Sequence, residues 1–250
     1  MERNKIIETD GLTKHYGPIV AVEGLSLSVS QGEIFGFLGP NGAGKTTTIL
    51  MLLGLTRPTK GKASVYGLDP AREATKVKRV VGYLPEHLGF YDDLSARENL
   101  KYVARLNRIP DSVSEERIEK ALDTVGLVSD SKRRVSTFSR GMRQRLGIAE
   151  ILIKEPRLVI LDEPTLGLDP EASNRMIELI QKLSKDRGMT VLFSSHFLQQ
   201  VQKISDKIGI MIRGKMVAQG AIDDLAKEKL GVEQEKYSLE ELYMKYFREG

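Results

Sequence analysis

The chain has 250 residues, 40% of them hydrophobic, and a formal net charge of +4, which fits one large globular domain with a real core. It contains no cysteine, which excludes disulfides and thiolate metal sites. No apolar run approaches the roughly 18 residues of a membrane span, and the first residues lead into no signal-like segment. We therefore expect a cytoplasmic protein.

Residues 5–29 contain short, partly alternating apolar runs, which predict antiparallel strands. Residues 33–38 then predict a buried strand and residues 47–53 a helix. The loop between them, GPNGAGKT, fits the pattern G-x-x-x-x-G-K-[ST] of a phosphate-binding loop. Its glycines let consecutive backbone N–H groups approach a phosphate at a helix N-terminus. The sequence therefore predicts that a nucleoside triphosphate binds here.

Individual side chains of this loop have expected roles. Lys45 supplies a point charge for the β- and γ-phosphates, and the Thr46 hydroxyl is placed to ligate Mg²⁺. The expected nucleotide contacts in this part of the chain are Gly39, Pro40, Asn41, Gly42, Ala43, Gly44, Lys45, Thr46 and Thr47.

Residues 95–153 have a different character, with little strand signal and three helical candidates, at 96–108, 114–125 and 141–153. They predict a helical insertion. The densest basic cluster of the chain, residues 132–134, lies inside it. We interpret this cluster as a solvated loop, because three charges give nucleic acid little affinity at physiological salt.

Beyond the insertion, residues 158–161 and 190–193 are continuous apolar runs, typical of parallel strands buried on both faces. A helix at 171–184 is expected to connect them. A hairpin near 207–218 and two short amphipathic helices within 222–247 follow, the latter assigned to packing or a partner contact. The pattern predicts an α/β fold with a parallel sheet and helical crossovers.

Acidic and imidazole side chains follow the two apolar runs. Asp162 and Glu163 end the first run, and because successive strand side chains point to opposite faces, we expect different roles for them. Asp162 suits Mg²⁺, and Glu163 is expected to polarise the attacking water as a general base. His196, after the second run, is expected to point toward the γ-phosphate, the alternative being a structural histidine.

Several motifs together resemble the ABC ATPase superfamily. Residues 138–145, FSRGMRQR, resemble its signature motif, residues 158–163 its Walker B segment and residues 194–196 its switch histidine. Asp169 falls in its D-loop, Tyr16 matches the aromatic that stacks on adenine, and residues 82–86, GYLPE, resemble its Q-loop region. The motifs stand in the family's order and cover nearly the whole chain.

The resemblance implies a P-loop NTPase of the ABC ATPase fold, with a mostly parallel RecA-like sheet, an N-terminal antiparallel β subdomain and a helical subdomain. We expect the ATPase domain at residues 1–220, with the helical subdomain at about 88–153, and a helical tail at 221–250. The implied cofactors are ATP and Mg²⁺. The implied catalytic residues are Lys45, Glu163 and His196, and the implied Mg²⁺ ligands are Thr46, Asp162 and, less directly, Glu86.

The signature segment is expected to act on a second copy of the chain. Ser139 opens a helix, so its hydroxyl and the free N–H groups form an anion site, with Gly141 where a phosphate must come close. The resemblance implies a head-to-tail homodimer with two sandwiched ATP molecules, in which Ser139, Arg140, Gly141 and Met142 contact the partner's ATP.

Three positions depart from the common family pattern. Glu86 stands where many members carry Gln, and its charge would repel the γ-phosphate if no metal intervened, which leaves its direct role open. Arg140 replaces a glycine and could add positive charge near the partner's ATP. Met142 cannot make the hydrogen bonds of the usual Gln. This combination is similar to the ATPase subunits of prokaryotic two-component exporters.

The leading hypothesis is an ATP-hydrolysing subunit, peripheral at the cytoplasmic face of the membrane, that dimerises on ATP and drives an integral membrane permease. The Q-loop region and the helical insertion are expected to transmit the motion of the dimer to the permease, with Phe90, Tyr91 and Leu94 as either partner contacts or core residues.

One alternative is an ABC ATPase that acts on nucleic acid or the ribosome. The chain lacks the coiled-coil insertion or second cassette of such relatives, so no nucleic-acid partner is expected. The other is a regulatory module that binds ATP without hydrolysis, against which Glu163 and His196 argue.

Overall fold

Two β-sheets organise the computed structural model, which describes residues 4–231 and 238–249. The smaller sheet confirms the antiparallel strands expected in residues 5–29 and adds one strand that follows the phosphate loop in sequence. Its strands, all paired antiparallel to β1, are β1 (Lys5–Tyr16), β2 (Ile19–Leu25), β3 (Ser28–Ser30) and β5 (Lys60–Val65).

The larger sheet has the strand order β10-β9-β4-β8-β7-β6 and is parallel except for the hairpin strand β10 at one edge. Its strands are β4 (Ile34–Leu38), β6 (Val81–Leu84), β7 (Leu158–Asp162), β8 (Thr190–Ser195), β9 (Lys207–Ile212) and β10 (Lys215–Gly220). Every residue of β4, β7 and β8 is buried, as continuous apolar runs predict for strands covered on both faces.

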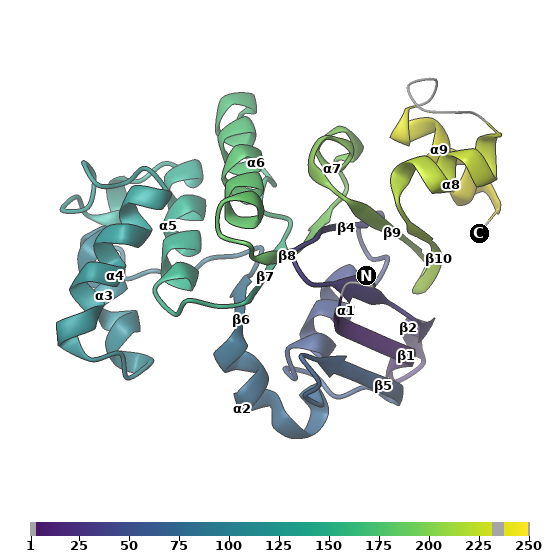
Figure 1. The fold of residues 1–250 in the computed structure, drawn as a ribbon, viewed down its shortest axis with the longest axis horizontal. Coiled ribbons are helices and arrows are strands. Elements are labelled where there is room, and N and C mark those ends of the chain that lie inside the picture. The colour runs from purple at the N-terminus through teal and green to yellow at the C-terminus, as the bar shows by residue number, and fades with distance from the viewer. Residues whose placement is uncertain (1–3, 232–237, 250) are drawn as a thin grey trace.

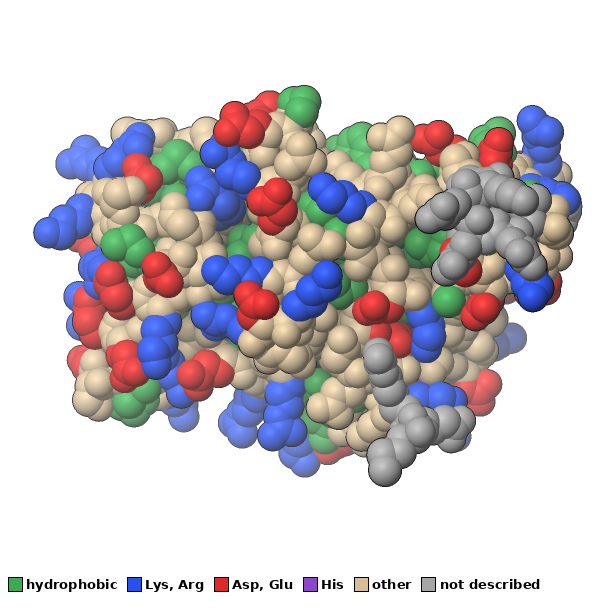
Figure 2. Space-filling model, turned by 45° about the horizontal axis from the view of Figure 1, so that its top comes forward, with side chains coloured by type: hydrophobic (Ala, Val, Ile, Leu, Met, Phe, Trp, Pro, Cys, Tyr) green, Lys and Arg blue, Asp and Glu red, His purple; other side chains and the backbone are tan. Residues whose placement is uncertain are grey.

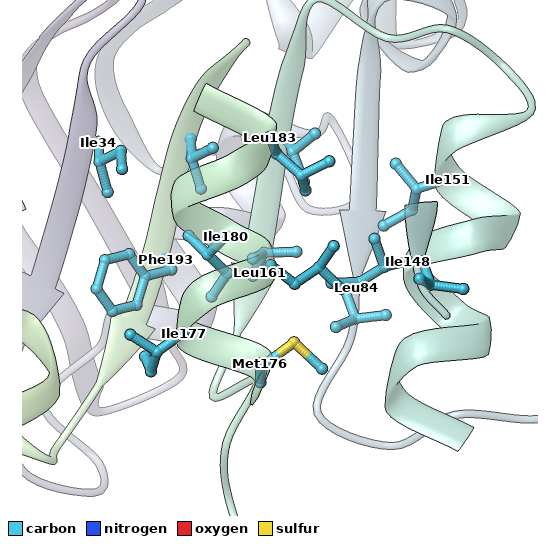
Figure 3. Packing of buried hydrophobic residues seen from close by; sticks show 14 of the residues in the cluster. Ile34, Leu84, Ile148, Ile151, Leu161, Met176, Ile177, Ile180, Leu183 and Phe193 are labelled. Carbon is cyan, nitrogen blue, oxygen red and sulfur yellow. The ribbon is translucent and has the colours of Figure 1, made fainter. Parts of the chain in front are cut away.

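Helices cover the larger sheet. They are α1 (Lys45–Leu52), α2 (Pro70–Val80), α6 (Pro170–Lys185) and α7 (Leu198–Ile204). Helix α6, expected at 171–184, turns Ile177, Ile180 and Leu183 toward the sheet, where Leu161 of β7 and Phe193 of β8 lie (Figure 3). The α/β architecture with helical crossovers is thus confirmed.

The predicted helical insertion forms a separate group of helices at one end of the molecule (Figure 1). These are α3 (Ala96–Leu106), α4 (Asp111–Thr124) and α5 (Arg140–Leu152), with a short 3-10 turn at Val135–Thr137. Helix α3 begins with a capping box between Ser95 and Glu98, which satisfies exposed N–H groups of its first turn. Helix α5 joins this group to the main core, because Ile148 and Ile151 lie next to Leu84 of β6 (Figure 3).

The C-terminal helices α8 (Ile222–Leu230) and α9 (Leu239–Glu249) lie at the opposite end from α3–α5 (Figure 1). They confirm the two helices expected within 222–247, while residues 232–237 lie outside the described residues. Leu239 and Leu242 are fully buried and belong to the same hydrophobic cluster as the main sheet. The Leu239 backbone N–H also donates to Oε1 of Gln202 at 3.2 Å.

The surface mixes charges of both signs. Figure 2 shows a face on which Lys and Arg side chains are interspersed with Asp and Glu. Residues 132–134 are all exposed, and Arg133 pairs with Asp130, in agreement with a solvated loop. None of the helices in the described ranges has the length and hydropathy needed to cross a bilayer.

Candidate functional site

The phosphate loop joins the carboxyl end of β4 to α1, as the sequence predicts. Gly42 and Gly44 have φ angles of 79° and 104°, which favour glycine because other residues rarely adopt them. A Cβ atom at Gly44 would lie 2.4 Å from the carbonyl oxygen of Ala21. Glycine is therefore required at this position by backbone conformation and by the close approach of β2.

A pocket of about 350 Å³ opens above this loop. It brings the predicted residues Glu86 and Glu163 to the loop, and it adds residues that the sequence interpretation missed. Its lining consists of Ile19, Val20, Ala21, Pro40, Asn41, Gly42, Ala43, Gly44, Lys45, Thr46, Thr47, Glu86, Glu163 and Leu166. The missed residues Ile19 and Val20 are 66% and 44% exposed. The available sequence signal was two apolar residues directly after the Gly-Pro turn at residues 17–18.

Three candidate catalytic side chains meet at the edge of this pocket. Oε1 of Glu163 lies 3.2 Å from Nζ of Lys45, and Oε2 lies 2.9 Å from Nδ1 of His196. The Lys45 ammonium also donates to the carbonyl oxygens of Gly39 and Pro40, at 2.6 and 3.2 Å. Because Lys45 and Glu163 are both buried, each compensates the charge of the other.

The direction of Glu163 is set by a turn and not by the pleat of a strand. Strand β7 ends at Asp162, and Glu163 has a φ of 48°. The expectation that strand alternation alone separates the two carboxylates is therefore wrong. A left-handed conformation at a non-glycine residue costs about 1–3 kcal/mol, and two hydrogen bonds hold it here. The Glu163 N–H donates to Oγ of Ser194 at 2.9 Å, and its carbonyl accepts from Leu166 at 3.0 Å.

Asp162 has the environment of a cation ligand. It is 1% exposed, and its Oδ1 accepts a hydrogen bond from Oγ of Ser194 at 2.6 Å. Its Oδ2 is buried without a partner among the described residues, which is costly unless a cation or donor satisfies it. No group of three or more His, Cys, Asp or Glu gathers in the described part of the chain. One or two protein oxygens suit Mg²⁺ shared with phosphates, so Asp162 with Thr46 fits that ion.

The signature segment has the expected local structure at a different surface. Ser139 caps α5 and accepts a hydrogen bond from the Met142 N–H at 3.3 Å. None of residues 139–142 is among those lining the phosphate-loop pocket. A Cβ at Gly141 would lie 3.0 Å from Cβ of Ala172, so in this chain the glycine also allows a close approach of α5 to α6.

Arg140 contacts its own chain. A Cβ at Gly167 would lie 2.4 Å from Nη1 and 2.7 Å from Cζ of Arg140, so the guanidinium covers that glycine. Asp169, the D-loop residue, caps α6 by accepting from the Ala172 N–H at 2.8 Å. The signature segment and residues 167–172 therefore pack together within one subunit.

Tyr16 lies at the end of β1, is 47% exposed and is not one of the residues lining the pocket. Nζ of Lys14 lies 4.8 Å from the centre of its ring. Tyr16 pairs in register with Ile19, which does line the pocket. The tip of the β1–β2 hairpin thus brings Tyr16 near the pocket mouth.

A second cavity, of about 290 Å³, extends the site toward the C-terminal helices. Its lining includes Gly39, Asn41 and His196 from the predicted site, together with Tyr243 of α9. Burial raises the pKa of the Tyr243 hydroxyl. No sequence pattern marks Tyr243, because its place depends on how α9 packs.

A glycine loop at the carboxyl end of a parallel strand, with an acidic pair on a nearby strand of the same sheet, defines a P-loop nucleoside triphosphatase. The sequence model described as ABC transporter matches residues 22–166. The chain therefore belongs to the ABC transporter family, as an ATP-binding subunit with ATPase activity.

Similar proteins agree with this assignment. The chain is 45% identical over 222 residues to the bacitracin transport ATP-binding protein BcrA of Bacillus licheniformis, covering 89% of this chain and 72% of that protein. It is 38% identical over 220 residues to the linearmycin resistance ATP-binding protein LnrL of Bacillus subtilis, covering 88% and 70%. A solved structure of an ATP-binding subunit of an ABC transporter matches with a TM-score of 0.85 and 31% identity, covering 97% of this chain and 99% of that one. The family resemblance and the fold expected from the sequence are confirmed.

Proposed function

We propose that this ATPase powers an exporter, and that Lys45, Glu163 and His196 carry its hydrolysis step. The observation behind the second part is the contact of one buried carboxylate with both a phosphate-loop lysine and a strand-end histidine. The names of two relatives, a bacitracin transporter subunit and a linearmycin resistance subunit, support export.

In the proposed mechanism, backbone N–H groups of residues 39–46 and the Lys45 ammonium hold the phosphates. Lys45 then exchanges its contact with Glu163 for the triphosphate, and Oε1 of Glu163 is free to accept a proton from water. That water attacks the γ-phosphorus, the bond to the β–γ bridging oxygen breaks, and ADP and phosphate result. His196 keeps the Glu163 carboxylate in place through Oε2.

Mg²⁺ fits this site through the unpartnered Oδ2 of Asp162 and the hydroxyl of Thr46. When bound, it would neutralise charge on the β- and γ-phosphates. Glu86 lines the same pocket, and we assign it no direct bond to the metal.

We infer that the second half of the ATP site comes from a second copy of the chain. Ser139 is exposed at the N-terminus of α5 and does not line the phosphate-loop pocket of its own subunit. A capped helix N-terminus is an anion site, and a two-fold head-to-tail dimer would bring it to the partner's ATP. We assign Arg140 a packing role, because its guanidinium covers residue 167 of its own chain.

A groove of about 700 Å³ is the proposed docking site of a cytoplasmic segment of the membrane permease. It lies between α1, α2, β6 and the end of α3, with apolar residues such as Leu55, which is 50% exposed, and Leu106, which is 65% exposed. Its cations are Lys78, Arg79, Arg108 and Lys154. Such a surface suits an amphipathic segment with acidic residues, and it would hold the subunit at the cytoplasmic face of the membrane.

We infer different roles for Phe90 and Tyr91. Phe90 is half-buried and packs against the main hydrophobic cluster, which supports a packing role for this residue. Tyr91 is 53% exposed and forms a T-shaped pair with Tyr102, with hydroxyl oxygens 3.1 Å apart. Tyr91 is the better candidate for a permease contact.

The decisive experiment is Glu163→Gln, measured as MgATP hydrolysis by the purified chain. We expect turnover to fall by about 10²–10⁴, with ATP binding retained. Near-normal turnover would refute Glu163 as the base. The transport assignment is tested separately by gentle solubilisation of native membranes: a polytopic membrane protein should copurify, and recovery of ribosomes or DNA in its place would overturn it.

A further inference from the structure

One side chain outside the nucleotide pocket joins the segments that carry Glu163 and His196. Gln200 lies on α7, which begins two residues after His196. Its Oε1 accepts a hydrogen bond from Oγ1 of Thr165 at 2.6 Å, and its Nε2 donates to Oγ of Ser173 at 2.8 Å. Thr165 and Ser173 are both buried. A single amide therefore connects the turn after β7, the first turn of α6 and helix α7.

The turn that Gln200 holds is conformationally unusual. It starts at Glu163 in a left-handed conformation and continues with two tight backbone hydrogen bonds, from Leu166 to Glu163 at 3.0 Å and from Leu168 to Thr165 at 3.2 Å. A residue in such a conformation keeps it only where the surrounding structure enforces it. Ser194 holds the turn at its start, through the Glu163 N–H. Gln200 holds it two residues later, through Thr165.

We propose that Gln200 is a positioning residue for ATP hydrolysis. It fixes the turn that carries Glu163 relative to the segment that carries His196, and so maintains the 2.9 Å contact between these two side chains. Gln200 is not among the residues that line the phosphate-loop pocket, so it acts through its neighbours. The inference rests on the proposed roles of Glu163 and His196.

A positioning role for Gln200 predicts that its loss affects the rate of hydrolysis and not the affinity for ATP. The phosphate loop is supported by β4 and α1, and the two hydrogen bonds of the Thr165–Gln200–Ser173 bridge join α7 to the turn after β7 and to α6. Loss of the bridge should therefore lower kcat and leave KM for ATP nearly unchanged. Misplacement of a catalytic group by about 1 Å can reduce the rate by about 10², and partial loosening of one turn should have a smaller effect.

A merely structural role makes a different prediction. If Gln200 only satisfied two buried hydroxyls, its removal would lower the thermal midpoint without a selective loss of kcat in the folded protein. The conservative variant Gln200→Glu keeps two acceptor oxygens for the Thr165 and Ser173 hydroxyls. Thr165→Val keeps the shape of the threonine side chain and removes only its hydroxyl.

The experiment compares Gln200→Ala, Gln200→Glu, Thr165→Val and the double variant Gln200→Ala with Thr165→Val in the full chain. Its matched control is Gln199→Ala, because Gln199 is the exposed neighbour on the same helix. For each protein, kcat and KM for MgATP and the thermal midpoint are measured. We expect kcat to fall about tenfold in Gln200→Ala and Thr165→Val, with KM within about twofold and the control unchanged. Gln200→Glu should recover most of the loss.

The double variant should be no slower than the slower single variant, since both remove the same hydrogen bond. Wild-type kcat in Thr165→Val, fully additive losses, or no recovery in Gln200→Glu would each overturn the inference. If Gln200→Ala does not fold, Thr165→Val still tests the inference, because it removes the same hydrogen bond. Glu163→Gln is assayed in parallel: if it hydrolyses ATP normally, the proposed base is wrong, whereas loss in Glu163→Gln with normal Thr165→Val refutes only the role of Gln200.

Discussion

Glu163 and His196 are 33 residues apart in the chain, and their side chains lie 2.9 Å from each other. They meet because β7 and β8 are neighbouring parallel strands in which Asp162 pairs with Ser194. The two strands therefore end at the same edge of the sheet. This is the edge at which α/β proteins bind ligands. The phosphate loop begins at this edge too, because Leu38 at the end of β4 pairs with Ser195 at the end of β8.

Asp162→Asn should raise stability while it removes Mg²⁺-dependent function. The variant eliminates a buried charge whose Oδ2 lacks a partner among the described residues, and the neutral amide should make the protein more stable by about 1 kcal/mol. The amide is a poorer Mg²⁺ ligand. We expect a higher thermal midpoint without metal and a much smaller increase in ATP affinity on adding Mg²⁺. A lower midpoint in metal-free buffer would contradict the assignment of Asp162 as a buried cation ligand.

Gly167→Ala should destabilise the protein, and Arg140→Ala should relieve part of that loss. Gly167 has a φ of 69°, and an added Cβ would collide with the Arg140 guanidinium. The backbone effect alone is about 1 kcal/mol, and the collision adds what it costs to move the flexible guanidinium aside. In a double-mutant cycle followed by urea unfolding, the two changes should be coupled by about 0.5 kcal/mol or more. Strict additivity would show that the contact between the Arg140 guanidinium and residue 167 contributes nothing to the loss of stability.

The structure also predicts a loss of stability at alkaline pH. Burial, then the nearby Asp162 and Glu86 carboxylates, raise the pKa of Tyr83 to about 12. In the unfolded chain the tyrosine pKa is about 10, so between pH 10 and 12 the folded state holds a proton that the unfolded state has lost. Stability therefore decreases as the pH rises through this window. Tyr83→Phe should remove this component of the pH dependence, while the remaining titration of lysines persists in both proteins.

Local motifs made much of this site predictable. Glycine spacing in residues 39–46, the apolar run before Asp162 and the Ser139 cap each depend on neighbours within a few residues, and the structure has these local features as expected. The sequence also indicated the sheet, because long apolar runs separated by helices have few alternative arrangements.

Other features depend on packing between distant segments and leave no local pattern. Gln200 reaches Thr165 only because α7 folds back beside α6. Tyr243 lines the same cavity as His196 only because α9 packs on α7. The left-handed Glu163 was missed for a related reason, since strand alternation was extended one residue past the true end of β7. The roles of such residues can be identified only once the three-dimensional structure is known.

Charge reversal in the proposed docking groove should separate permease binding from ATP hydrolysis. Lys78 and Arg79 are exposed cations on α2 that line this groove, and neither lines the phosphate-loop pocket. Lys78→Glu combined with Arg79→Glu should repel an acidic permease segment. We expect copurification of the membrane partner to fall at least about tenfold, which corresponds to about 1.4 kcal/mol of binding free energy, while basal ATPase activity of the isolated chain stays unchanged.

The matched control for charge reversal is Lys182→Glu, because Lys182 is an exposed lysine on α6, which Figure 1 shows across the sheet from α2. It should leave both copurification and hydrolysis at wild-type levels. Rising ionic strength should weaken the wild-type complex, because salt screens its attractive charge pairs. It should weaken the Lys78→Glu, Arg79→Glu complex less, because salt also screens the repulsion that the two glutamates introduce. Equal copurification of wild-type and charge-reversed proteins at low salt would locate the permease contact elsewhere, and the exposed Tyr91–Tyr102 pair would then be the surface to substitute.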